Sequence, residues 1–164
     1  MRAAAAICGL VLATAPVAAL AQDDVKTAPI PGDGAWTLAT VGAGGSGGCF
    51  ADLSGTQVDT MVMVNRDSKM VMSAGRPDWR LGTAEMQVSL QIDGGDKHAL
   101  TVSPIDNAFL VLIDDPALQT SLEGAHRITW TLPAGQFSAE VTGLGKAFQV
   151  ATACGLAAAR AVRP

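Results

Sequence analysis

The segment Met86–Ser103, MQVSLQIDGGDKHALTVS, decides the fold class. Two apolar runs flank a polar centre, DGGD, at positions 93–96. Aspartate and glycine are the residues that tight turns use for positive φ angles, and apolar runs on both sides of such a turn predict paired strands. The segment therefore predicts a β-hairpin near the middle of the chain.

More strands are predicted on the N-terminal side of this hairpin. Ala35–Val41 alternates well enough for a first strand. The glycine-rich run 42–48 cannot hold a regular element and predicts a loop. Thr56–Asn65 and Lys69–Ala74 predict a second hairpin, with its turn at 66–68.

The segments on either side of the central hairpin predict a connection before it, and a strand and a short helix after it. Gly75–Gly82, which precedes the hairpin, predicts a turn-rich connection that carries Trp79. The segment SPID at 103–106 is expected to break the hairpin, and the apolar run Asn107–Asp114 predicts the next strand. Asp115 as N-cap and proline at the first helical position predict a helix over Pro116–Glu123.

The C-terminal part predicts two strands and a longer helix. His126–Leu132 places Ile128, Trp130 and Leu132 on one strand face, so Trp130 is expected to be buried. A return strand over Gln136–Thr142 follows, and then a helix to about Cys154, which Ala157–Pro164 either extends or leaves frayed. The fold class predicted is mainly β (α+β): an antiparallel sheet or small β-sandwich with a short helix and a C-terminal helix packed on it.

The N-terminus predicts export. Residues 1–21 combine an early positive charge with an apolar run that ends in Ala19-Leu20-Ala21, which is typical of a secretory signal peptide. A membrane anchor is the alternative, but Pro16 and the small-x-small end favour cleavage. Residues 22–34 then predict a flexible or extended leader, and 35–164 predict a single β-rich domain. We expect a periplasmic protein with no stable membrane span after cleavage.

Composition limits the classes of partner. The chain has 15 Asp and Glu against 11 Lys and Arg, with a net charge of −4. An acidic chain without a basic run is a poor nucleic-acid binder, so no nucleic-acid partner is expected.

Two cysteines remain once Cys8 leaves with the signal peptide. In an oxidising compartment, an even count predicts a disulfide between Cys49 and Cys154.

The spacing of four methionines has two interpretations, a metal site and ordinary core packing. They fall at spacing two in the second predicted hairpin, so that each pair shares a strand face. Thioethers suit copper(I), yet methionine also packs readily in cores, and core packing is the favoured interpretation. The four are Met61, Met63, Met70 and Met72.

Other candidate chemistry is weak, and no catalytic, cofactor-binding or metal residue is assigned. The run 42–48 lacks the Gly-Lys-Ser/Thr ending of a phosphate loop. The turn at 93–96 lacks the further oxygen ligands of a calcium loop. His98 and His126 have no second ligand at helical spacing beside them, which favours surface or structural histidines over a metal ligand or general base.

Several segments after Met86 resemble a known group of proteins. They are the strand ending in Ile-Asp-Gly-Gly at 92–95, the segment PALQTSLEG at 116–124, a strand through Ile128 and Trp130, and the segments 137–143 and 147–154. This order is similar to small exported proteobacterial proteins of the invasion-associated locus B type and their uncharacterised periplasmic relatives. That type carries extra cysteines after the Asp-Gly-Gly strand, whereas 97–122 has none. The resemblance implies an exported β-rich domain, and no role in host-cell entry is carried over.

The function expected is therefore broad. An exported periplasmic protein without enzyme activity, binding another protein or an envelope component, is the leading hypothesis. An inhibitor or immunity factor against a periplasmic or cell-wall hydrolase is an alternative, in which the loops 42–48 and Gly75–Gly82 would plug a cleft. An enzyme without a recognisable motif is a further alternative, because catalytic residues need not be close in sequence.

Overall fold

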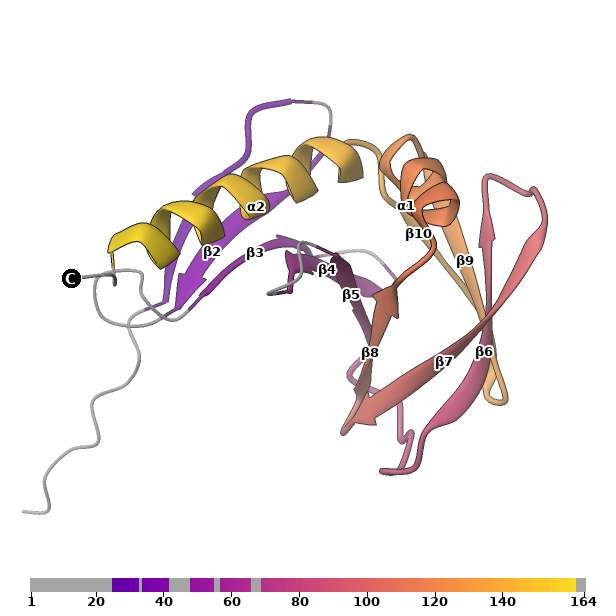
Figure 1. The fold of residues 1–164 in the computed structure, drawn as a ribbon. Coiled ribbons are helices and arrows are strands. Elements are labelled where there is room, and N and C mark those ends of the chain that lie inside the picture. Colours follow the sequence, from indigo (N-terminus) through magenta and orange to yellow (C-terminus); the bar gives the residue numbers. More distant parts are fainter. Residues whose placement is uncertain (1–24, 33, 42–47, 55–56, 66–68, 162–164) are drawn as a thin grey trace, which may run out of the picture.

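The protein folds as one strongly bent antiparallel sheet with two helices against it (Figure 1). The computed structural model describes residues 25–32, 34–41, 48–54, 57–65 and 69–161, so the predicted signal peptide lies outside the described residues. Ten strands lie in the order β1-β2-β3-β4-β5-β8-β7-β6-β9-β10. The strands are β1 (Lys26–Pro29), β2 (Thr37–Val41), β3 (Gly48–Leu53), β4 (Asp59–Val64), β5 (Met70–Gly75), β6 (Met86–Ile92), β7 (Lys97–Ile105), β8 (Ala108–Ile113), β9 (Arg127–Leu132) and β10 (Gly135–Glu140), and the helices are α1 (Pro116–Glu123) and α2 (Leu144–Ala161).

The central hairpin is confirmed and lies where the sheet bends. Its first strand, β6, pairs with β7 from Met86 opposite Val102 to Gln91 opposite Lys97. Beyond Val102, β7 continues and pairs with β8 instead. The long strand β7 therefore belongs to both halves of the sheet, and Figure 1 shows the two halves turning away from each other at this strand.

The predicted break of the hairpin at 103–106 holds for the pairing with β6, which ends at Val102, but the strand itself continues to Ile105. Pro104 lies within β7, opposite Phe109 of β8. Proline removes one backbone donor, and it is tolerated where a strand exchanges one partner for another. The turn that follows is made by Asp106 and Asn107, with Asp106 at a positive φ of 54°.

Two strands were not predicted. Lys26–Pro29, inside the predicted leader, is extended and pairs as edge strand β1 with β2. All four of its residues are exposed, so no apolar alternation marks it in the sequence. The second is β3, which starts at Gly48 and so shortens the predicted loop, whose residues 42–47 lie outside the described residues.

The core lies between the two halves of the sheet and under the helices. Figure 1 shows α2 running over β2, β3 and β4, with α1 beside the other half. The predicted burial of Trp130 is confirmed, since the side chain is fully buried, with its ring 5.0 Å from that of Phe109. The largest fully buried side chains are Trp130, Phe109, Met70, Met72, Leu90, Ile113, Leu122 and Ile128.

The helices follow their sequence signals closely. Asp115 caps α1 by accepting a hydrogen bond from the N–H of Ala117 at 2.8 Å, and Gly124 ends the helix. The C-terminal helix α2 continues past Cys154 to Ala161, so the alanine-rich end extends the helix, in keeping with its high helix propensity. Within the described residues, neither helix is long and apolar enough to cross a membrane.

Candidate functional site

The best-formed candidate site is built around loop 76–85, which connects β5 to β6. Trp79 anchors this loop in the core with only 3% of its surface exposed. Its ring stacks on Phe109 at 5.9 Å and meets Phe137 edge-on at 5.1 Å. Burial of so large an aromatic side chain stabilises one position of the loop.

Backbone hydrogen bonds fix the same loop to the turn between β7 and β8. The N–H of Arg76 donates to the backbone carbonyl of Asn107 at 3.0 Å, and the N–H of Leu81 donates to the backbone carbonyl of Asp106 at 3.4 Å. Within the loop, the N–H of Trp79 donates to the carbonyl of Arg76 at 3.1 Å. The loop is thus held by its neighbours on both sides of Trp79.

The anchored loop presents charged side chains to solvent. Arg76 donates two hydrogen bonds to Asp78, from Nε at 2.8 Å and from Nη2 at 2.9 Å. This pairing is the main cause that lowers the pKa of Asp78 and raises the pKa of Arg76. The Arg76 guanidinium also lies 4.9 Å from the ring centre of Phe137, a cation–π contact. Arg80 donates to the carbonyl oxygens of Pro77 and Trp79.

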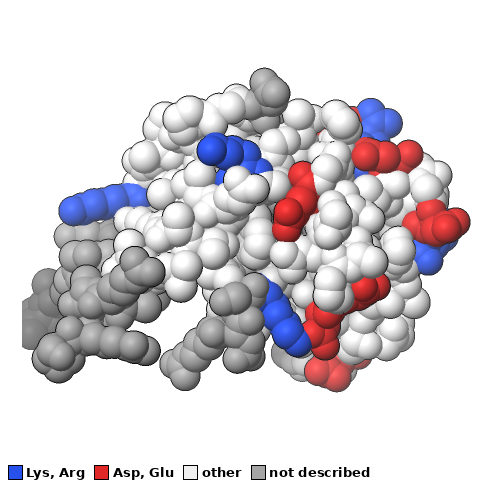
Figure 2. All heavy atoms as spheres, turned by 45° about the horizontal axis from the view of Figure 1, so that its top comes forward, with Lys and Arg blue, Asp and Glu red and all other residues white. Residues whose placement is uncertain are grey.

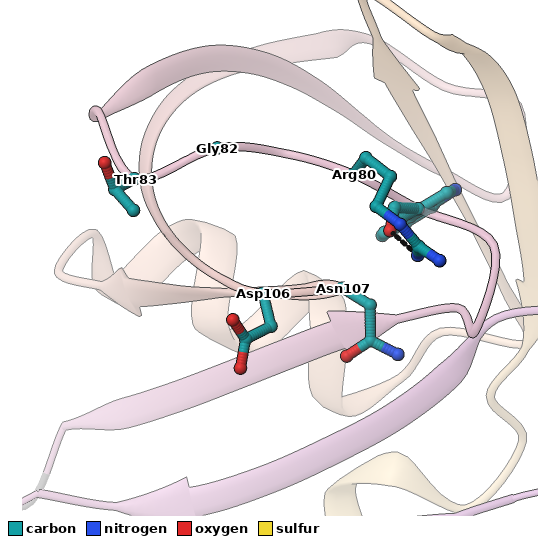
Figure 3. Close-up of a pocket in the computed structure, with 6 residues that line it drawn as sticks. Arg80, Gly82, Thr83, Asp106 and Asn107 are labelled. Carbon is teal, nitrogen blue, oxygen red and sulfur yellow. Dashed lines mark hydrogen bonds between the residues drawn. The ribbon is translucent and has the colours of Figure 1, made fainter.

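Two open hollows adjoin the loop. One, of about 440 Å³, lies between the loop residues Arg80, Gly82 and Thr83 and the turn residues Asp106 and Asn107 (Figure 3). The other, of about 610 Å³, is lined by Gln57, Arg76, Pro77, Asp78, Gln136 and Phe137. We call the exposed charged side chains of loop 76–85, together with these two hollows, the loop surface.

The turn at 93–96 has a structural role. Asp93 and Gly94 both have positive φ, 46° and 76°, and the N–H of Gly95 donates to the carbonyl of Ile92 at 2.8 Å. Two successive residues at positive φ are what Asp-Gly pairs favour in hairpin turns, and the register of Gln91 opposite Lys97 leaves residues 92–96 in the connection. The Asp93 carboxylate accepts the backbone N–H groups of Arg127 at 2.7 Å and His126 at 3.1 Å. It thereby ties the turn to the start of β9.

These hydrogen bonds also set the electrostatics of Asp93. The pKa of its carboxyl is lowered, first by the Arg127 N–H and then by the His126 N–H. The imidazole Nδ1 of His126 lies 3.8 Å from the carboxylate, and the side chain is 77% exposed. An exposed imidazole at this distance is a weak partner, so His126 is a surface histidine. His98 lies on β7 opposite Leu90.

The structure does not assemble the methionines into one site. Val62 lies opposite Met72 and Val64 opposite Met70, so Met70 and Met72 share the core face with these valines. Both methionines are fully buried. Met61 and Met63 point to the other face of the sheet, because successive side chains alternate. The sheet separates the two pairs, and in the described part of the chain no three His, Cys, Asp or Glu side chains are grouped to hold a metal.

Cys49 and Cys154 form a disulfide in the structure. Cys49 is buried on β3 and Cys154 lies in the second half of α2, with 5.9 Å between their Cα atoms. The bond ties the C-terminal helix to the N-terminal half of the sheet.

Surface charge is dispersed on the face that α2 covers. Figure 2 shows scattered basic and acidic side chains there, and the described residues on that face form no continuous basic patch. The distribution fits the acidic composition.

Comparison with known proteins adds a distant structural likeness. No family model and no curated protein matches the chain. The chain resembles an invasion associated protein. Among solved structures, the crystal structure of invasion associated protein b from Bartonella henselae is 15% identical, with a TM-score of 0.49, and the match covers 75% of this chain and 92% of that one. The predicted resemblance is confirmed as a weak likeness, which is too distant to assign a function.

Proposed function

We propose that this protein is exported to the periplasm and there binds another protein or an envelope component, without catalysis, through the loop surface. The observation that carries this proposal is the anchoring of loop 76–85. Its single tryptophan is buried between Phe109 and Phe137, while Asp78 and Arg80 remain exposed. The loop combines a fixed backbone with accessible polar groups.

Such a loop is suited to recognition for an energetic reason. Association loses free energy whenever side chains and loops must be ordered, roughly 0.5–1.5 kcal/mol for each immobilised side chain. A loop that is already fixed by backbone hydrogen bonds avoids much of that loss. Functional groups carried on loops over a rigid sheet are also the common arrangement in binding proteins.

The proposed location rests on the sequence and the disulfide together. Residues 1–21 have the pattern of a secretory signal peptide. The bond between Cys49 and Cys154 is of the kind that persists in oxidising compartments such as the periplasm. Both features favour the same compartment.

Site-specific photocrosslinking in intact cells tests the binding proposal. A photoreactive residue in place of Arg80 lies on the loop surface, whereas one in place of the exposed Lys146 on α2 serves as the matched control. We expect a discrete crosslinked product from position 80, absent from position 146, that excess unlabelled protein competes away. Equal labelling at both positions, or no competition, would contradict a specific loop surface.

Inhibition of a periplasmic or cell-wall hydrolase is a second candidate. The same fixed loop favours it, because an inhibitor must enter a cleft without losing free energy to ordering. Wall-hydrolase assays with purified protein distinguish the two. A stoichiometric block that is relieved by Trp79→Ala, with the sheet still folded, is expected only of an inhibitor that uses this loop.

A further inference from the structure

The outer face of the sheet, opposite the core, is unusually apolar over β3, β4, β5 and β8. The strand register places one row of outer side chains as Phe50, Met63, Val71 and Leu112. Leu112 is 45% exposed, and the other three are half-buried. Antiparallel sheets that face water normally alternate apolar and polar residues, and contiguous exposed apolar surface is typical of interaction sites.

A small hollow lies beside this apolar row. It measures about 170 Å³, and Asp52, Met61 and Ser73 line it from one cross-strand row of β3, β4 and β5. Asp59 and Ala108 line it from the next row. Sites for drug-sized ligands measure roughly 300–1,000 Å³, so this hollow has room for a single side chain.

Ser73 indicates that the hollow receives a polar group. It is only 8% exposed, although it lies on the outer face between Met61 and Leu110. Among the described residues, its hydroxyl makes no hydrogen bond. The Ser73 oxygen is not among the fully buried side-chain atoms that lack a partner, so it is open to the hollow. A ligand group that donates a hydrogen bond there would meet a free acceptor on an otherwise buried residue.

Among the described residues, the two carboxylates of the hollow, Asp52 and Asp59, make no ion pair. Asp52 accepts a hydrogen bond from Ser54. Arg76 also lines the hollow, but both of its hydrogen bonds to a carboxylate go to Asp78. The hollow therefore carries unbalanced negative charge.

We infer that this hollow binds a lysine or arginine side chain of the partner protein. The apolar stem of that side chain would lie against Met61 and Ala108, and its charged head would donate to Asp52, Asp59 and the hydroxyl of Ser73. The adjoining apolar row fits a partner surface rather than a free amine. This inference rests on the proposed binding function and adds the chemistry of the partner, a basic residue within an apolar patch.

An NMR titration of the isotope-labelled mature protein tests this inference. The probe is N-acetyl-arginine amide, and the control ligand is the neutral citrulline analogue of the same shape. We expect saturable shifts at Ser73, Gly75 and Asn107 with the arginine probe, and binding roughly tenfold weaker with citrulline, as for loss of a hydrogen bond to a charged group.

Matched variants locate the effect. Asp59→Asn is expected to weaken the arginine probe roughly tenfold, and Asp96→Asn, in an exposed turn, to leave it unchanged. Ser73→Ala should weaken binding while the unfolding midpoint stays level, because the hydroxyl makes no hydrogen bond to the described residues. Equal shifts with both ligands, or equal effects of Asp59→Asn and Asp96→Asn, would overturn the inference.

The two proposals can fail separately. If the arginine probe does not bind but crosslinking at position 80 persists, the hollow is not a cation site and the binding function stands. If the probe binds in the hollow while position 80 gives no specific product, the loop surface is wrong, and the basic residue belongs to a partner of the outer face alone.

Discussion

At the scale of single residues, Asp93 has the most informative role. It adopts a positive φ in the turn between β6 and β7, and its carboxylate accepts two backbone N–H groups at the start of β9. One side chain therefore shapes a turn and connects two segments that lie over 30 residues apart, since Asp93 and Arg127 are separated by 34. Aspartate suits both tasks because it tolerates this backbone region and offers two acceptor oxygens.

The lowered pKa of Asp93 predicts a defined pH dependence. A carboxyl whose folded pKa lies below its ordinary value of 3.8 stabilises the fold above that value, and the contribution is lost as pH falls through the folded pKa. Asp93→Asn removes the titration while retaining one acceptor oxygen. We expect wild type to be more stable than the variant at neutral pH, with the gap closing below about pH 4. Urea midpoints across pH 2–7 measure this. A gap independent of pH would show that the carboxylate charge contributes nothing.

Residue-level prediction succeeded where periodicity was simple. Alternation placed Trp130 in the core, and the cap signals placed both ends of α1. The place of Ser73 in a hollow had no sequence signal, because Asp52 of β3 and Ala108 of β8, which are distant in sequence, complete the lining. Spacing alone also left the methionines ambiguous, since only the register of β4 on β5 separates the two pairs.

At the scale of elements, the contact between α1 and α2 depends on a glycine. A Cβ atom added at Gly145 would lie 2.6 Å from the carbonyl oxygen of Glu123, the last residue of α1. Gly155 lies in the same helix, where an added Cβ would meet Val64 at an ordinary 3.6 Å. Both glycines lie in helical backbone, but only Gly155 has room for a Cβ atom.

This difference predicts opposite effects of the same substitution. Gly145→Ala is expected to destabilise the protein by about 1–3 kcal/mol, because the helices must move apart. Gly155→Ala should stabilise it by about 0.5–1 kcal/mol, because alanine is the better helix former and fits the space. Chemical denaturation of both variants provides the comparison. A stabilised Gly145→Ala protein would mean that α1 and α2 are not in close contact.

Elements were predicted where local patterns are strong and were missed where pairing alone defines them. The exposed strand β1 exists because it pairs with β2, and β3 follows a glycine run that favoured a loop. Pro104 favours the end of a strand, yet β7 continues through it, because the strand changes its pairing partner there from β6 to β8. Tertiary pairing overrides local propensity in each case.

At the scale of the whole molecule, the order of strands carries information that no local pattern contains. The meander β6-β7-β8 is placed so that β8 pairs with β5, and the chain then returns through α1 to β9, which pairs with β6. This arrangement brings loop 76–85 against the β7–β8 turn and so creates the loop surface. The loop was predicted as a connection with a tryptophan, but its anchoring depends on Phe109 and Phe137 from other strands.

The disulfide between Cys49 and Cys154 acts at this same scale, because it closes a loop with a sequence separation of 105. In the chain-entropy model, closing about 100 residues stabilises a fold by roughly 4–5 kcal/mol. Small domains have total stabilities of about 5–15 kcal/mol, so the bond is a major term. Reduction should therefore lower the urea midpoint strongly, and amide exchange should rise first in the second half of α2, which the bond ties to β3.

The measurement compares oxidised and reduced wild-type protein, which share one sequence, with a Cys49→Ala, Cys154→Ala double variant as the control. The double variant should match the reduced protein and show no response to reductant. A non-reducing digest of exported material should contain the Cys49–Cys154 peptide. Two alkylatable thiols in that material, or an unchanged midpoint after reduction, would contradict the bond as a stabilising link. The anchoring of α2 would then rest on the packing of its buried residues Leu144, Ala147, Phe148 and Ala151.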